Sequence, residues 1–149
     1  MHRLVTLILL LLTGLPARLL AEGAPETAIR QALERWTDDF DAGRSAMVCD
    51  LFAPDLRADV RGAPPRSFDI QCQLLRKALA DPERAYTYAF ELKEIIVDRE
   101  IAVVRLTWTT VSRFKATGET SMTKDEGLDV FRHGGDGWHI IRYMAYELP

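Results

Sequence analysis

The sequence has 149 residues, of which 48% are hydrophobic and 28% charged, and its formal net charge is −3. This length and apolar content predict one compact domain with a substantial core and exclude a disordered chain. The charges are nearly balanced and contain no basic run, which argues against a nucleic-acid-binding surface.

Residues 1–21 have the order of segments found in a secretory signal peptide. A short basic start precedes an apolar run from Leu4 to Leu12, and helix breakers and small residues follow up to Ala21. The run is shorter than the roughly 20 apolar residues of a membrane-spanning helix. We therefore expect cleavage after Ala21, export to the periplasm or the outside of the cell, and a mature domain over 22–149 that is not membrane-bound. An uncleaved N-terminal anchor is the alternative.

Export would place two cysteines, Cys49 and Cys72, in an oxidising compartment, where an even number of cysteines permits a disulfide. Such a bridge requires the two Cα atoms to lie within about 7 Å of each other. Two buried free thiols that pack as small apolar groups are the alternative.

Three helices are expected in the first half of the domain. The first spans residues 27–41, because apolar side chains recur there at spacings of three and four residues: Ile29, Leu33, Trp36 and Phe40. A short second helix is expected from Ser45 to Phe52 and a third after Ser67, which can cap its first turn. The third ends before Asp81–Pro82.

The remainder is predicted to form strands. A short strand is expected at 56–61, between the second and third helices, and alternating apolar residues predict four more strands after the third helix: 86–97, 101–112, 119–132 and 138–146. The run Gly134–Gly137 is the strongest turn signal. Segregated helices and strands indicate an α+β fold. We expect a curved, mainly antiparallel sheet covered by the first helix, with a cavity at its open end.

Several stretches of the sequence resemble the nuclear transport factor 2-like superfamily, in its SnoaL-like and ketosteroid-isomerase-like branch. They are Arg35–Gly43, Leu51–Ala53, Asp59 with Gly62, Pro65–Ser67 and Asp129–Arg132. The resemblance covers roughly residues 28–147 and implies a cone-shaped, cystatin-like α+β fold that pairs sheet to sheet as a homodimer. The fold hosts isomerases, dehydratases, cyclases, hydrolases and binding modules, so it specifies the architecture more closely than the function.

The resemblance also implies candidate catalytic residues. In ketosteroid isomerases a Tyr on the first helix and a neutral Asp on a late strand donate hydrogen bonds to an oxyanion, and a second Asp moves the proton. The position of this base falls on Asp59 if one residue is deleted after Asp55, and on Val60 without that gap. The neutral acid falls on Asp129. The Tyr position holds Trp36, which can donate a hydrogen bond but cannot relay a proton. A solvated carboxylate is the alternative for both aspartates.

Aromatic side chains are the expected lining of the pocket, with packing in the core or at an interface as the alternative: Trp36, Phe40, Tyr88, Trp108 and Phe131. No cofactor is expected, because the sequence has no glycine-rich phosphate loop after a strand and no nucleophile elbow. No metal is expected either, because His133 and His139 lack the further ligands of a metal site.

Three functions are compatible with these features. The first is an exported binding module for a small apolar molecule, which the missing Tyr favours. The second is a cofactor-independent isomerase or lyase, such as a dehydratase or cyclase, that uses Asp59 as base and Asp129 with Trp36 as donors. It requires Asp59 or Asp129 to titrate well above the usual value of about 3.9. The third is an exported protein-interaction or immunity module whose sheet binds a partner.

Overall fold

The computed structural model of the chain describes residues 23–149. The expected signal peptide over 1–21 lies outside the described residues, so its cleavage stays a prediction. Within the described part, neither helix combines the length and the apolar character that crossing a membrane requires.

Helix α1 (Ala24–Asp41) starts slightly before the expected boundary and has the expected apolar face. Its four apolar side chains are all buried: Ile29, Leu33, Trp36 and Phe40. A proline in the first turn suits the start of a helix, because the missing N–H has no partner there in any case. The helix ends before Gly43, whose φ of 71° lies in the left-handed region that glycine adopts without strain.

The expected short helix from Ser45 to Phe52 is not formed, and this prediction was wrong. Residues 42–51 form consecutive turns instead, in which Met47 N donates to Arg44 O and Asp50 N donates to Met47 O. The carbonyl of Val48 accepts the indole N–H of Trp36, so a tertiary contact uses the oxygen that a helix would need for its own ladder.

Strand β1 (Phe52–Val60) begins earlier than expected and is followed by the two-residue strand β2 (Arg66–Ser67). Ser67 then caps α2 (Phe68–Leu79) as predicted, because its hydroxyl accepts the backbone N–H of Ile70. Cys72 of α2 forms a disulfide with Cys49 in the turn segment, with the two Cα atoms 5.5 Å apart. The bond fastens the turn segment to α2.

The remaining chain forms the expected meander of four long strands. They are β3 (Arg84–Asp98), β4 (Ile101–Phe114), β5 (Thr120–Gly134) and β6 (Gly137–Glu147). The sheet has six strands in the order β2-β1-β6-β5-β4-β3. All neighbours are antiparallel except β1 and β6, which are parallel. The predicted α+β class is therefore confirmed, with a mixed sheet that does not close into a barrel.

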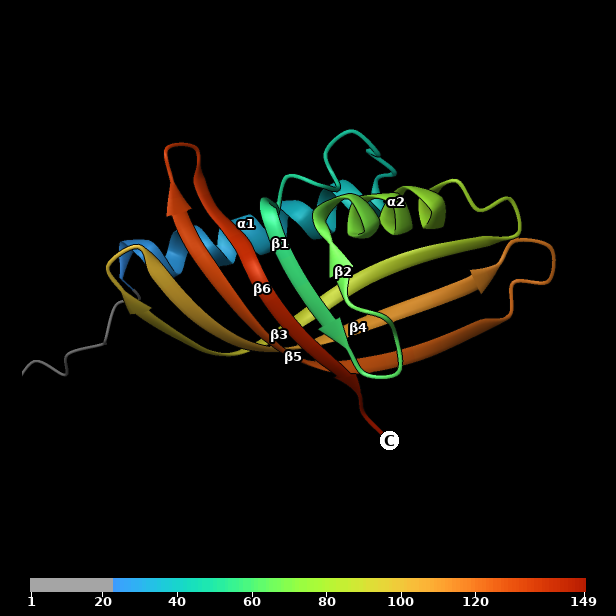
Figure 1. Ribbon diagram of the computed structural model, residues 1–149. Helices are drawn as coiled ribbons and strands as arrows, with labels where there is room; N and C mark the ends of the chain where they lie inside the picture. Colours follow the sequence, from blue (N-terminus) through green and yellow to red (C-terminus); the bar gives the residue numbers. More distant parts are fainter. Residues whose placement is uncertain (1–22) are drawn as a thin grey trace, which may run out of the picture.

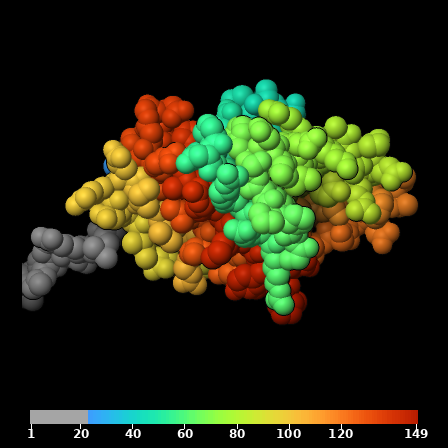
Figure 2. Space-filling view, viewed as in Figure 1, coloured from blue at the N-terminus to red at the C-terminus, as the bar shows by residue number. Residues whose placement is uncertain are grey.

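Both helices lie on the concave side of the strongly curved sheet (Figure 1). Helix α1 packs against β3 and β6, and α2 packs against β1, β2 and β3. Figure 2 shows β1, β2 and α2 side by side on one face of the molecule. The core fills the space between α1 and the middle of the sheet, with Leu33, Leu106 and Phe131 fully buried. The space near α2 is only partly filled and forms the site described next.

Candidate functional site

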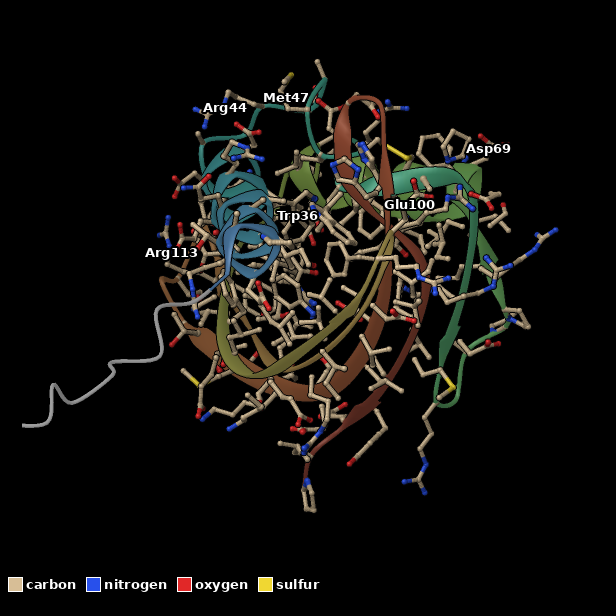
Figure 3. The ribbon with its side chains drawn as sticks, turned by 90° about the vertical axis from the view of Figure 1, so that its left-hand side faces the viewer. Trp36, Arg44, Met47, Asp69, Glu100 and Arg113 are labelled. Carbon is tan, nitrogen blue, oxygen red and sulfur yellow. A yellow bond between two sulfur atoms is a disulfide. The ribbon has the colours of Figure 1, made fainter. Side chains whose placement is uncertain are left out.

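A cavity of about 330 Å³ lies between the two helices and the concave face of the sheet. Its walls come from α1, the turn segment, α2 and all six strands: Trp36, Leu51, Phe52, Val60, Arg66, Gln71, Leu75, Tyr88, Trp108, Thr110, Thr123, Asp125, Asp129, Ile140, Tyr143 and Ala145. Figure 3 shows the sheet curving beneath α1, with Trp36 on the side of the helix that faces the interior. The cavity is therefore built from segments far apart in the sequence.

One wall of the cavity is aromatic, and three of the five expected aromatic residues form it. The ring of Trp36 lies 5.3 Å from those of Tyr88 and Trp108, each in an edge-to-face arrangement. Phe40 and Phe131, the other two, do not line the cavity. Both are buried in the core, where Phe40 packs 4.7 Å from Tyr88. They support the wall and cannot contact a ligand in the cavity.

Trp36 cannot act as the expected hydrogen-bond donor. Its indole nitrogen is its only donor, and it already donates to the carbonyl oxygen of Val48 at 2.9 Å. The contact is buried, so breaking it would leave an unsatisfied carbonyl. Trp36 therefore presents only an apolar ring surface to the cavity.

Asp129, one of the two expected catalytic residues, lines the cavity and has a raised pKa. Its side chain is 2% exposed. Burial raises its pKa to about 8, although a hydrogen bond from the Trp108 side chain works in the opposite direction. The carboxyl group is therefore mainly neutral at pH 7. Because an indole only donates, the Asp129 proton is left available to another acceptor.

Gly127 makes the contact between Trp108 and Asp129 sterically accessible. The three residues lie on the same face of β4 and β5, and Gly127 pairs with Leu106. A Cβ atom at Gly127 would lie 3.5 Å from Trp108 Cδ1 and from a methyl group of Leu106. A single Cβ atom would just fit beside the indole, whereas a branched side chain at this position would press against Trp108.

Asp59, the expected base, is exposed and is not part of the cavity wall. Its neighbours on β1 face inward: Ala58 is buried and Val60 lines the cavity. Because side chains alternate along a strand, the Asp59 carboxylate points away. The expectation that it acts from within the cavity is corrected by this geometry, and the first strand supplies an apolar residue instead.

Three polar lining residues had not been singled out from the sequence, and they form one network. Gln71 on α2 accepts two hydrogen bonds at Oε1, from the Tyr143 hydroxyl at 2.8 Å and from Arg66 Nη1 at 3.3 Å. Tyr143 lies directly opposite Asp129 in the register of β5 and β6. Burial raises the pKa of Tyr143 to about 12, so its hydroxyl stays neutral. The network is thus a neutral pair with one cation.

Asp125 is a second carboxylate in the cavity, four positions before Asp129 and on the same face of β5. It is half-buried, and its pKa is raised by burial and by the nearby charge of Glu147. The sequence could have indicated that Asp125 lines the cavity, because alternate residues of a strand point to the same face. This face of β5 carries Asp125, Gly127, Asp129 and Phe131.

Within residues 23–149, no group of three or more His, Cys, Asp or Glu side chains is placed to hold a metal ion. The cavity offers an aromatic wall, a neutral carboxyl group at Asp129, a second, half-buried carboxyl group at Asp125 and a half-buried guanidinium group at Arg66. Such a site can hold a small molecule by shape and apolar contact and can orient it with few polar groups.

Solved structures share this architecture at low sequence identity. A conserved protein from Planctomyces limnophilus is 18% identical, with a TM-score of 0.75 over 83% of this chain and 96% of that one. A putative scytalone dehydratase from Novosphingobium aromaticivorans is 14% identical, with a TM-score of 0.72 over 83% of each chain. A ketosteroid isomerase-like protein from Erwinia carotovora atroseptica is 20% identical, with a TM-score of 0.66 over 83% of this chain and 95% of that one.

These likenesses show the fold. No curated protein matches the sequence. The model of the SnoaL-like domain matches residues 33–143, which include the second half of α1, all of α2, the first five strands and the part of β6 up to Tyr143. The match spans the greater part of the chain and all but one of the residues that line the cavity. The chain therefore belongs to the SnoaL-like domain family.

Proposed function

We propose that the protein binds a small, largely apolar molecule in the cavity between its helices and its sheet. The observation that carries the proposal is the 330 Å³ space walled by the rings of Trp36, Tyr88 and Trp108. Rigid aromatic walls supply contact area without much loss of side-chain entropy. The ligand also needs an acceptor such as a carbonyl oxygen, because the neutral Asp129 carboxyl has a proton to donate.

Intrinsic fluorescence tests the proposal, because Trp36 and Trp108 both line the cavity. We expect the neutral ketone 2-acetylnaphthalene to quench the emission in a saturable way. Ala145 faces the cavity and Met144, beside it on β6, is 56% exposed. Ala145→Phe should fill the cavity and weaken binding at least tenfold, whereas Met144→Phe should bind like the wild type. Equal affinity in both variants would place the ligand elsewhere and contradict the proposal.

A catalytic role is the second candidate, and the raised pKa of Asp129 favours it. A carboxyl group that is neutral at pH 7 can donate to a developing enolate oxygen. Asp59 is exposed, so the carboxylate within the cavity that could accept a proton is Asp125. This arrangement corresponds to a cofactor-independent isomerase or lyase.

Deuterium uptake from D₂O, next to the carbonyl of 2-acetylnaphthalene, distinguishes turnover from binding alone. A catalyst should accelerate the exchange seen by NMR, and Asp125→Asn should abolish the acceleration while Asp59→Asn leaves it unchanged. If the exchange proceeds at the same rate with and without protein, the protein binds this ketone without activating it.

Export to the periplasm or the outside of the cell is part of the proposal. Besides the signal-like N-terminus, it is supported by the disulfide between Cys49 and Cys72, since such bonds persist in oxidising compartments. Expression of the full chain followed by N-terminal sequencing of the exported product should yield a chain that begins at Glu22. A product that keeps Met1 and stays inside the cell would count against export.

We also propose a homodimer that pairs through the convex face of the sheet. Exposed apolar side chains support this face as the interface: Ile96, Ile101, Met122, Met144 and Tyr146. The cavity opens on the opposite, concave side, so pairing would leave it free. Light scattering should give twice the chain mass, and Tyr146→Lys should shift the protein toward monomer. A wild-type protein that is monomeric at high concentration would exclude the dimer.

A further inference from the structure

The cavity contains a half-buried cation, Arg66, whose hydrogen-bond partners Gln71 and Tyr143 are both neutral. We propose that Arg66 is an anion subsite and that the ligand is an apolar carboxylic acid, bound with its carboxylate on the guanidinium group and its apolar part against the aromatic wall. This inference rests on the proposed binding function and adds the chemical class of the ligand.

The position of Arg66 is fixed by its neighbours in the chain. It lies on β2, directly before Ser67, which caps α2, and β2 pairs with β1 at the edge of the sheet. Its Nη1 donates to Gln71 Oε1, and its side chain also donates to the Tyr143 hydroxyl. Both partners are neutral, so they orient the guanidinium group without balancing its charge.

Ion pairs elsewhere in the described part of the chain join surface cations to carboxylates. Arg44 contacts Asp39 at 2.6 Å and Arg132 contacts Asp55 at 2.8 Å, while Lys93 and Arg105 pair with glutamates. Those pairs lie on the outside of the molecule. Arg66 is the lining residue with a permanent positive charge, and holding such a charge half-buried beside neutral groups costs free energy that an anionic ligand would recover.

The two carboxyl groups of the cavity do not take this role. Asp129 is mainly neutral below pH 8, and Asp125 lies on β5, three strands from β2 in the order of the sheet. Asp125 lies close to the charge of Glu147 and is influenced by Arg66 only through space. The guanidinium N–H groups that do not contact Gln71 or Tyr143 are therefore available to an anionic ligand.

A matched pair of probes tests the subsite, using the fluorescence assay above. The probes 2-naphthoic acid and 2-naphthamide have nearly the same shape, and only the acid is charged at pH 7. We expect the wild type to bind the acid about tenfold more tightly than the amide, as charge-assisted hydrogen bonds require. Arg66→Gln should bring the two affinities to within twofold. Arg57→Gln, which removes an exposed charge from the adjacent strand β1, should keep the tenfold preference.

The outcomes separate the subsite from the binding function. If the wild type binds amide and acid equally, or if Arg66→Gln keeps the preference for the acid, the anion subsite is wrong while the binding proposal stands. If neither probe binds and 2-acetylnaphthalene also fails, the binding proposal itself is wrong. Binding of the amide by Arg66→Gln would show that this variant is folded. If the variant does not fold, the ratio of the two affinities measured on the wild type still tests the subsite.

Discussion

Replacing Asp129 by asparagine should remove a pH-dependent penalty from the folded state. The pKa of Asp129 is raised from 3.8 to about 8 by burial, so between these values the unfolded chain has lost a proton that the folded chain keeps. Stability must then fall as the pH rises through this window. Each pH unit contributes up to about 1.4 kcal/mol, so the wild type loses about 3 kcal/mol from this group between pH 5 and pH 7.

The amide introduced by Asp129→Asn would have no charge to bury and would keep an oxygen for the Trp108 N–H. Urea denaturation of both proteins at pH 5, 6 and 7 gives the free energies of unfolding, and contributions from all other groups cancel in their difference. We expect the difference, variant minus wild type, to grow by about 3 kcal/mol from pH 5 to pH 7. Asp59→Asn, at an exposed position on β1, should show no such growth. A difference for Asp129→Asn that stays constant over this range would refute a buried, neutral carboxyl group.

Three further perturbations address other parts of the fold. Serine at both Cys49 and Cys72 should lower the free energy of unfolding by about 3 kcal/mol, because the bond joins positions 23 residues apart; a reductant should then have no further effect in urea denaturation. Gly127→Ala should leave the melting temperature nearly unchanged, whereas Gly127→Val should displace Trp108, lower the melting temperature and alter the near-ultraviolet circular dichroism; identical spectra would contradict the packing. Phe40→Ala should cost about 4 kcal/mol in urea denaturation, since the ring is 1% exposed, and a loss below about 1 kcal/mol would show that the core collapses around it.

Features with strong local periodicity could be predicted from the sequence. The apolar spacing in α1, the serine cap of α2 and the alternation of the four long strands all led to elements that the structure contains. The aromatic wall followed from the same patterns, because Trp36 lies on the inner face of α1 and Tyr88 and Trp108 share the inner parity of β3 and β4. Local propensity and tertiary packing agree in these segments.

The polar half of the cavity could not be predicted in this way. Counting alternate residues from Trp138 and Ile140, both buried, puts Arg142 on the inner face and Tyr143 on the outer face. The pairing of β5 with β6 shifts between Val130 and Phe131, which leaves an extra residue at Ile141 and reverses the parity. Tyr143 therefore points into the cavity, and no signal in the amino acids around it marks the bulge.

The error at Asp59 has a similar physical origin. The assignment depended on where a one-residue gap is placed in the resemblance to ketosteroid isomerases, and a shift of one residue moves a side chain to the opposite face of a strand. The pairing of β1 with β6 is itself irregular between Phe52 and Arg57. The strand register, which depends on long-range pairing, decides that Val60 and not Asp59 faces the cavity.

The parallel pairing of β1 with β6 has a consequence for the order of assembly. During synthesis β1 emerges early, but the neighbour that covers its inner edge is the last strand made, after α2 and the whole meander. Until then β1 has only the two-residue β2 beside it, and the wall that carries Val60 has no fixed place. The closing event is a contact between distant parts of the chain, which makes folding slow compared with the hairpins formed by successive strands. In a nascent chain of this kind the inner edge of β1 therefore stays unpaired until the final strand is available.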